Sequence, residues 1–306
     1  MPAPPFRRVA IVGVGLIGGS LGLAVRRRWR GVRVVGIDRA AVLRRALKRG
    51  AVHEGTTSLA AGLRGCDLIV LALPVDGIIG ILPRLRRLAD KGAIVTDVGS
   101  TKVEILAAAA RHGLRGRFVG GHPMAGSERS GVENADAGLF DDAPWVLCPL
   151  GGTPVAGVRR LASGVGARPV SLPARQHDEL MAGISHLPQL LSVALVNAAV
   201  AGRGRRHLGL AGPGFRQMAR LAASSPRLWD GILRTNAPAV RRAMRRLAGE
   251  LRILERSLET GCAPRFRRAA RLRAASYRRP GGGVELGGDR RRTVRRRGRR
   301  GAGGGA

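Results

Sequence analysis

The sequence predicts a doubly wound α/β domain with a mainly parallel sheet, followed by an all-helical domain. Over the first 150 residues, short apolar runs alternate with amphipathic stretches, which is typical of strand–helix–strand units. The run Asp67–Leu73 (DLIVLAL) is almost wholly apolar, so we expect both faces of the sheet to be covered by helices. From Ala174 to about Leu258 the pattern becomes helical.

The expected elements follow this alternation in order. Each strand is a short apolar run, and Pro74 marks the end of the third. The predicted strands are Val9–Gly13, Val32–Asp38, Asp67–Leu73, Ala93–Asp97, Phe118–Gly121 and Trp145–Pro149, with a short αβ unit up to Val170. The predicted helices between them are Leu16–Trp29, Ala40–Arg49, Val75–Leu88 and Lys102–Arg111.

These patterns divide the chain into three regions, which we place at residues 1–172, 173–261 and 262–306. Within the second, Ala239–Leu258 carries apolar residues at spacings of three and four, the mark of an amphipathic helix with one apolar stripe. A long stripe on a small domain needs cover, so we expect a homodimer. The third region holds 15 arginines against two acidic residues and is rich in glycine. Such a tail is predicted to be disordered.

The charge balance of the chain raises the possibility of nucleic-acid binding. The chain of 306 residues has a formal net charge of +34, and 51 of its 54 basic residues are arginine. This density favours nonspecific contact with polyanions, and a nucleic-acid-binding protein on the same scaffold is an alternative. Because the arginine bias is spread over the whole chain, we expect no specific nucleic-acid site. Deleting residues 262–306 tests this alternative: polyanion affinity should fall, whereas any activity of the two preceding regions should survive.

Cellular location follows from other features. The sequence has no uninterrupted apolar run of 18 residues and no signal-peptide architecture at Met1–Arg8, and its three cysteines are scattered. We therefore expect a cytoplasmic protein that does not cross a membrane. No grouping of His, Cys, Asp and Glu has metal-ligand spacing, so no metal site is expected.

A glycine-rich turn joins the first strand to the first helix. Gly13, Gly15 and Gly18 form GxGxxG, in which the glycines allow a tight turn, approach of a pyrophosphate and close helix–strand packing. Asp38 follows 20 residues later at the end of the second strand, where a carboxylate accepts hydrogen bonds from ribose hydroxyls. The pattern predicts a Rossmann site for NAD, and Arg39 leaves NADP possible. The cofactor residues assigned are Gly13, Gly15, Leu16, Ile17, Gly18, Asp38, Leu73 and Pro74.

Further motifs follow later strands and helices. In order they are Asp97–Lys102 (DVGSTK), Gly120–Glu128 (GGHPMAGSE), Ser185–Pro188 (SHLP), Gly214–Ala222 (GFRQMARLA) and Trp229. Together they resemble the prephenate/arogenate dehydrogenases of tyrosine biosynthesis over roughly residues 7–260. The resemblance implies transfer of hydride from C4 of a cyclohexadienol to NAD, with loss of CO2 that aromatises the ring.

The resemblance gives His122 the central catalytic role. It implies that His122 accepts the proton of the C4 hydroxyl, and an imidazole with an unperturbed pKa of about 6.5 suits a base at neutral pH. His122 also stands at the carboxyl end of a predicted parallel strand, where ligands bind in such sheets. The other reading is a histidine that hydrogen-bonds the loop backbone.

Other residues receive roles by the same resemblance. Ser100 orients His122 and touches the nicotinamide, although it also suits a helix N-cap. Glu128 lies at the mouth of the site or is a solvated loop residue. Arg220 binds the substrate carboxylate through its guanidinium fork, and Arg216, one turn earlier, assists. Trp229 forms a wall of the substrate site or packs in the core.

The sequence departs from the family in the helical domain. His186 is expected to hydrogen-bond the substrate or to orient a neighbouring helix. Gln189 replaces the second of a histidine pair, and as a substrate contact it cannot carry charge. Gln217 and Ala219 stand where Asp and Thr are common. These changes leave the substrate open, with prephenate favoured over arogenate; no role is assigned to the remaining histidines, His53, His112, His177 and His207.

Two enzyme-related alternatives remain. A β-hydroxyacid dehydrogenase shares the glycine motif and a helical second domain, but it needs a catalytic lysine there, and the chain has no lysine after Lys102. A catalytically weakened regulator is suggested only by Gln189, Gln217 and Ala219, and measurable turnover excludes it.

Overall fold

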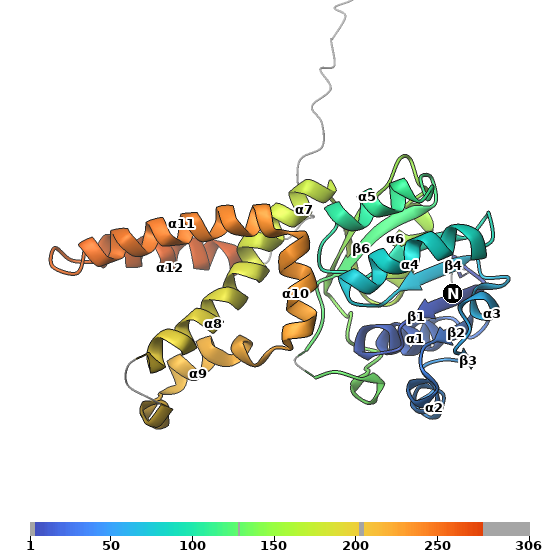
Figure 1. The fold of residues 1–306 in the computed structure, drawn as a ribbon, viewed down its shortest axis with the longest axis horizontal. Helices are drawn as coiled ribbons and strands as arrows, with labels where there is room; N and C mark the ends of the chain where they lie inside the picture. Colours follow the sequence, from blue (N-terminus) through green and yellow to red (C-terminus); the bar gives the residue numbers. More distant parts are fainter. Residues whose placement is uncertain (1–3, 128, 202–204, 278–306) are drawn as a thin grey trace, which may run out of the picture. The chain divides into compact units, whose positions relative to one another are not determined.

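The computed structural model describes residues 4–127, 129–201 and 205–277. By its internal contacts the chain divides into two units, residues 1–251 and 252–306. Within the described residues of the first unit, eight strands form one sheet in the order β3-β2-β1-β4-β5-β6-β7-β8 (Figure 1). The strands are β1 Arg8–Val12, β2 Arg33–Ile37, β3 Glu54–Thr56, β4 Leu68–Leu71, β5 Ile94–Asp97, β6 Phe118–Pro123, β7 Pro144–Pro149 and β8 Arg168–Ser171.

Neighbouring strands are parallel throughout, except that β7 runs antiparallel to β6. Helices pack on both faces of this sheet because successive strand residues point to opposite sides. The helices of this half are α1 Leu16–Arg28, α2 Ala40–Lys48, α3 Leu59–Leu63, α4 Val75–Leu88, α5 Val103–Arg111 and α6 Ala156–Gly164, with the 3-10 turn η1 at Val132–Asn134. The predicted doubly wound α/β fold is confirmed.

Alternate residues of β1 divide between two cores. Val9 and Ile11 pack in the first cluster with Leu21 of α1 and Leu161 of α6. Ala10 and Val12 face the second cluster, which contains residues of α3, α4 and α5. The sheet is therefore sealed on both sides, and only its carboxyl edge is left to form a site.

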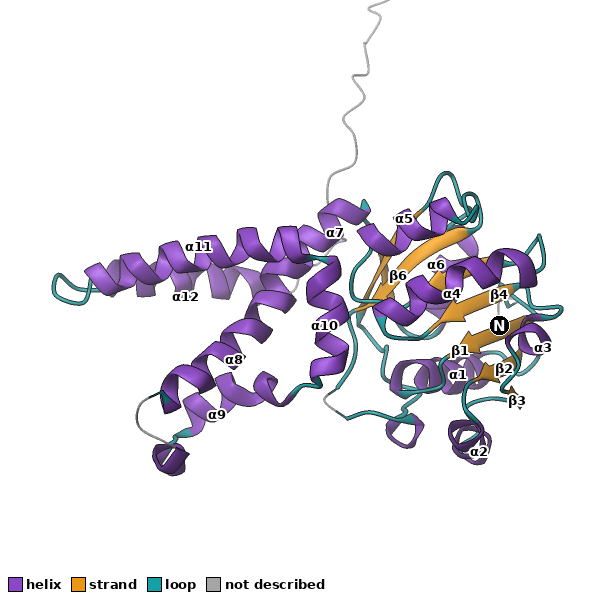
Figure 2. Cartoon of the chain, viewed as in Figure 1, coloured by secondary structure: helices purple, strands orange, loops and turns teal. Residues whose placement is uncertain are grey.

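The remainder of the described chain consists of helices (Figure 2). They are α7 Ala174–Met181, the π-helical segment η2 Ala182–His186, α8 Leu187–Val200, η3 Arg205–Leu210, α9 Pro213–Ala219, η4 Arg220–Ala223, α10 Pro226–Thr235, α11 Ala237–Arg256 and α12 Ala263–Tyr277. A small third core joins Ala182 to Val240 and Ala243 of α11. The predicted helical second half is confirmed.

The stretch Ala174–Val200 is long and apolar enough to cross a membrane by length and composition, and 17% of the tested window is buried inside the chain. The sequence alone predicted no candidate span, because an uninterrupted apolar run was required. This stretch is interrupted by polar residues such as His177, Asp178 and His186, although its mean hydropathy is high. These polar side chains are buried in hydrogen bonds. The stretch therefore combines a mostly unburied apolar surface with a few buried polar side chains.

The structure differs from the sequence prediction in two places. The elements β3 and α3 were not predicted, because they are only three and five residues long. The expected disorder of residues 262–306 does not hold for Ala263–Tyr277, which forms α12. This segment is dominated by alanine and arginine, which are both strong helix formers. The rest of the tail lies outside the described residues.

Candidate active site

The glycine turn has the geometry that its motif requires. Gly13 adopts a φ of +93°, and a Cβ there would overlap the backbone of Ala72. A Cβ on Gly18 would overlap the carbonyl of Gly13, so helix and strand meet closely there. By contrast, a Cβ on Gly15 would meet nothing within 4 Å. The backbone at Gly15 is therefore open to an approaching ligand, while the other two glycines shape the turn.

A cavity of about 320 Å³ opens beside this turn. It brings together several residues that the sequence assigned to the cofactor: Gly15, Leu16, Ile17, Leu73 and Pro74, with Ser100 from the loop after β5. Leu228 and Ile232 of α10 and residues 129–131 after β6 also line it. The cavity lies at the carboxyl edge of the sheet, where ligands bind in such folds.

Asp38 lies at the end of β2 and is tied to the glycine turn. Its Oδ2 accepts a hydrogen bond of 2.8 Å from the backbone N–H of Val14, and its Oδ1 accepts one of 2.7 Å from that of Arg39. Each carboxylate oxygen has a second lone pair, so both can still accept from a ribose. The exposed Arg39 side chain lies beside it. Turn, cavity and carboxylate together fit a dinucleotide.

His122 ends the run of glycines at the carboxyl end of β6. Its side chain is 8% exposed, and its Nδ1 lies 2.8 Å from Nε2 of His177 on α7. The two rings meet edge to face, with centroids 5.0 Å apart. The sequence assigned no role to His177, so the nearest partner of the predicted base was missed.

Asp178 fixes the direction of this hydrogen bond. Its Oδ1 lies 2.7 Å from Nδ1 of His177, and its two oxygens also accept the backbone N–H groups of Lys102 and Val103 at 2.7 and 2.9 Å. Because a carboxylate accepts, His177 donates from Nδ1 and accepts at Nε2. His122 then donates from Nδ1, so its Nε2 carries the lone pair. We call these three residues the histidine relay.

Burial sets the protonation state of His122. Burial lowers the pKa of His122 well below 6.5, and the nearby His177, Lys102 and His186 lower it further. The ring is therefore neutral at pH 7. Among the described residues no group hydrogen-bonds Nε2 of His122. A neutral imidazole with a lone pair at a strand end can accept a proton.

A buried ion pair holds the backbone beneath His122. Lys102 and Asp97 are both fully buried, and the Lys102 ammonium contacts Oδ2 of Asp97 and donates to the carbonyl of Gly121 at 2.7 Å. Oδ1 of Asp97 accepts the N–H of Gly121 at 3.0 Å. The pair therefore fixes both polar groups of the residue before His122. Neither charge was predicted to matter, although both lie in the DVGSTK motif.

His186 occupies the π-helical segment η2 and is fully buried. Its Nδ1 lies 3.2 Å from Nδ2 of Asn236, which also donates to the carbonyl of Asp178 at 2.7 Å. Burial lowers the pKa of His186 to about 4. Its Nε2 has no partner among the described residues, and its ring lies edge to face against Trp229, 5.9 Å between centroids. Trp229 thus packs against His186 and the second core cluster together.

Among the described residues Ser100 makes no side-chain hydrogen bond to His122 or to the start of α5, whose first N–H groups bond to Asp178. Ser100 lines the cofactor cavity, so its expected place beside the nicotinamide stays a prediction. Glu128 lies outside the described residues.

The residues expected to bind the substrate lie on α8, α9 and η4. Arg220 begins η4 and is exposed, and Arg216 donates from Nε to the carbonyl of Ala211 at 3.1 Å. Gln189 is buried on α8, and both ends of its amide bond to the chain near Arg220. One donor and one acceptor of the Gln189 amide are therefore used within the chain, and its expected contact with the substrate stays a prediction.

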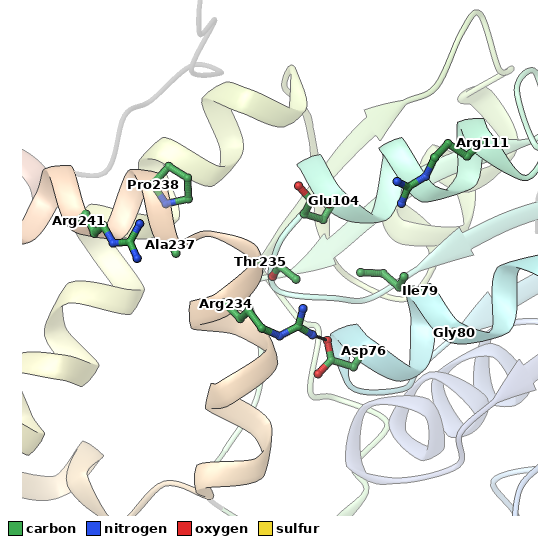
Figure 3. A pocket seen from close by; sticks show the side chains of 10 residues that line it. All are labelled: Asp76, Ile79, Gly80, Glu104, Arg111, Arg234, Thr235, Ala237, Pro238 and Arg241. Atoms are coloured by element: carbon green, nitrogen blue, oxygen red, sulfur yellow. Dashed lines mark hydrogen bonds and ion pairs between the residues drawn. The ribbon is translucent and has the colours of Figure 1, made fainter.

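A second cavity of about 620 Å³ lies between α4, α5, α10 and α11 (Figure 3). Arg234 and Asp76 form an ion pair across it. Thr235 lines the same cavity and hydrogen-bonds Thr101 at 2.8 Å. It is followed by Asn236, the partner of His186. This cavity contains none of the predicted site residues.

Sequence and structure comparisons place these features among known proteins. Residues 21–171 match the family model of the prephenate dehydrogenase nucleotide-binding domain, and residues 173–272 match that of its dimerization domain. The chain is 34% identical over 236 residues to prephenate dehydrogenase of Lactococcus lactis subsp. cremoris, covering 76% of this chain and 65% of that protein. It is 31% identical over 245 residues to cyclohexadienyl dehydrogenase of Zymomonas mobilis, covering 77% and 83%.

The fold has a solved counterpart. The crystal structure of prephenate dehydrogenase from A. aeolicus, in complex with hydroxyphenyl propionate and NAD+, matches with a TM-score of 0.81 at 28% identity, over 90% of this chain and 99% of that one. The chain spans just under two thirds of the length of the Lactococcus relative.

Proposed function

Because the chain belongs to the prephenate/arogenate dehydrogenase family, we propose that it is an NAD-dependent prephenate dehydrogenase. The reaction is the oxidative decarboxylation of prephenate to 4-hydroxyphenylpyruvate and CO2. The observation that carries the proposal is the histidine relay, which leaves His122 neutral with its Nε2 lone pair at the edge of the sheet. The proposed division of labour is residues 1–172 for the nucleotide and 173–261 for the substrate and dimer.

The dinucleotide is held by the features that its shape requires. The open backbone at Gly15 and the helix start behind it suit the pyrophosphate, Asp38 suits the ribose hydroxyls, and Leu73 and Pro74 border the cavity where Ser100 lies. NAD, when bound, accepts the hydride from C4 of the substrate. Asp38 favours NAD over its 2′-phosphorylated form, which the exposed Arg39 would have to accommodate.

His122 removes the proton of the C4 hydroxyl at its Nε2. The proton leaves oxygen as the C4–H bond electrons depart, so the carbinol becomes a carbonyl; loss of the ring carboxylate as CO2 then aromatises the ring. His177 accepts the hydrogen bond from Nδ1 of His122 and stabilises the imidazolium that forms, and Asp178 holds His177 in the required tautomer. Arg220, with Arg216, is proposed to bind the side-chain carboxylate of the substrate.

The decisive experiment measures NADH formation with prephenate and with arogenate, on the wild type and His122→Asn. We expect turnover of prephenate and a fall in kcat of about 10²–10⁴-fold in the variant, with NAD binding by fluorescence unchanged. Faster turnover of arogenate would make the chain an arogenate dehydrogenase. No turnover of either substrate contradicts the proposal.

The partner proposed for the helical half is a second copy of the chain. Ile184, Val193 and Met244 are exposed large apolar side chains on η2, α8 and α11, and residues 173–272 match a model described as a dimerization domain. Light scattering after size exclusion tests this, and a stable monomer excludes it. We propose a cytoplasmic location, where the free thiols of Cys66, Cys148 and Cys262 stay reduced.

A further inference from the structure

The segment that carries Arg220 has little packing of its own. Neither α9 nor η4, which together span Pro213–Ala223, contains a buried residue. Burial of apolar side chains, which fixes most helices in a protein, is therefore only partial here: Phe215 and Leu221 are half-buried. Hydrogen bonds to α8 add to this partial packing.

The amide of Gln189 supplies such an interaction. The side chain is 4% exposed. Its Nε2 donates to the carbonyl of Leu221 at 2.8 Å, and its Oε1 accepts from the hydroxyl of Ser224 at 3.2 Å. The Leu221 carbonyl also accepts the backbone N–H of Ser224 at 3.0 Å. The buried amide of Gln189 thus hydrogen-bonds both to Leu221 within η4 and to Ser224, which follows it.

We propose that Gln189 is a positioning residue: it holds η4 through Leu221 and Ser224 and so aims Arg220 at the substrate, without touching the substrate itself. The role requires a donor and an acceptor on one short side chain, which an amide provides and a carboxylate or a thioether does not. The inference rests on the proposed function, because Arg220 is the proposed carboxylate ligand.

The proposal predicts a split between substrate binding and chemistry. The histidine relay is built from β6 and α7 and has no hydrogen bond to Gln189 among the described residues. Loosening η4 should therefore raise KM for prephenate and leave kcat, the pH profile and KM for NAD almost unchanged.

The test uses Gln189→Met, which keeps the length of the side chain and removes both hydrogen bonds. We expect KM for prephenate to rise about tenfold and kcat to stay within about twofold. Ser224→Ala removes one of the two bonds and should raise KM by a smaller factor. Gln176→Met, an exposed glutamine on α7, is the matched control and should change neither constant.

A double-mutant cycle with Arg220→Ala distinguishes positioning from direct contact. If Gln189 acts through Arg220, Gln189→Met adds no further rise in KM once Arg220 is gone. Multiplying effects in the double variant would mean that Gln189 contacts the substrate, and a kcat that falls with KM would mean a disturbed relay. Either result overturns the proposal.

Hydrogen–deuterium exchange gives a readout without turnover. Gln189→Met should speed exchange of the amides in residues 213–225 and leave β5 and β6 unchanged. If the wild type does not turn over prephenate, the proposed function fails, and this measurement still decides whether Gln189 holds the segment. Unchanged exchange in residues 213–225 overturns the positioning role.

Discussion

Two regions of the proposed active site are held in different ways. The base His122 stands at a strand end, next to backbone that a buried ion pair fixes, and its relay partners His177 and Asp178 are buried as well. The proposed carboxylate ligand Arg220 stands on a turn with no buried residue, which one glutamine grips. Among the described residues, buried polar contacts fix the chemical half, whereas the segment around Arg220 contains no buried side chain.

This difference has a physical meaning. Groups that meet developing charge act best when they need no reorganisation at the moment of reaction, and buried hydrogen bonds keep them in place. A ligand for a peripheral carboxylate tolerates more movement, because it changes binding more than the barrier. Substrate choice can therefore shift through the helical half while the reaction type stays fixed by the sheet edge.

The largest effect should follow from breaking the buried ion pair. Lys102→Met leaves Asp97 as a buried charge without its cation and should lower the free energy of unfolding by about 3–5 kcal/mol. Urea denaturation measures this. Lys91→Met, at an exposed lysine, is the control and should stay within about 0.5 kcal/mol. Equal effects of the two variants would show that the sheet edge is no more firmly built than the surface.

The relay itself should matter for rate. Asp178→Asn replaces an acceptor by a group that also donates, so His177 loses its enforced tautomer and cannot reliably accept from His122. We expect kcat to fall by about 10²–10³-fold, with KM for NAD unchanged. Glu179→Gln removes an exposed charge one residue along α7 and should change kcat less than twofold. A matching small effect for Asp178→Asn would reduce the relay to a structural contact.

The pH dependence of kcat/KM on the acid side tests whether His122 is buried and neutral. His122 must be neutral to accept a proton, and burial lowers its pKa well below 6.5. The rate kcat/KM of the free enzyme should therefore hold constant as pH falls through 6.5 and drop only below it. A midpoint at or above 6.5 in the acid limb contradicts the buried, neutral His122.

The free energy of unfolding should also decrease as the pH falls. The folded-state pKa of His186 is about 4, against about 6.5 for an unfolded histidine. Between these values the unfolded chain binds the extra proton, so stability is full above pH 6.5 and falls as pH drops towards 4. For His186 alone the full loss is about 3 kcal/mol. His186→Asn should flatten this part of the unfolding curve, and an unchanged slope would place the loss elsewhere.

How far the sequence predicts this molecule depends on how local each feature is. All strands except the three-residue β3, together with the turn at Gly13–Gly18, Asp38 and the position of His122, were predictable, because each depends on a run of neighbouring residues. The His122–His177 contact joins residues 55 apart, and the Gln189 contacts reach 32 and 35 residues along the chain. Periodicity carries no information about such pairs.

Some signals were present but ambiguous. The adjacent His177 and Asp178, on the first helix of the second half, form the only His-Asp dipeptide in the chain, and they could have suggested a relay. The replacement at Gln189 suggested a substrate contact, because sequence alone did not show that Leu221 and Ser224 use its amide. The predicted roles of Ser100, Trp229 and Glu128 stay predictions.

The smallest effect is expected at the second cavity. Arg234 and Asp76 pair there with side chains 63% and 49% exposed, so solvent screens them, and Asp76→Asn should cost at most about 1 kcal/mol and leave kcat unchanged. Thr235→Val, one residue on, strands the buried hydroxyl of Thr101 and should cost about 1–3 kcal/mol. Thermal unfolding in low and high salt separates the two, because only the ion pair should respond to salt. If Asp76→Asn were the costlier change, surface charge rather than burial would hold α10 against α4.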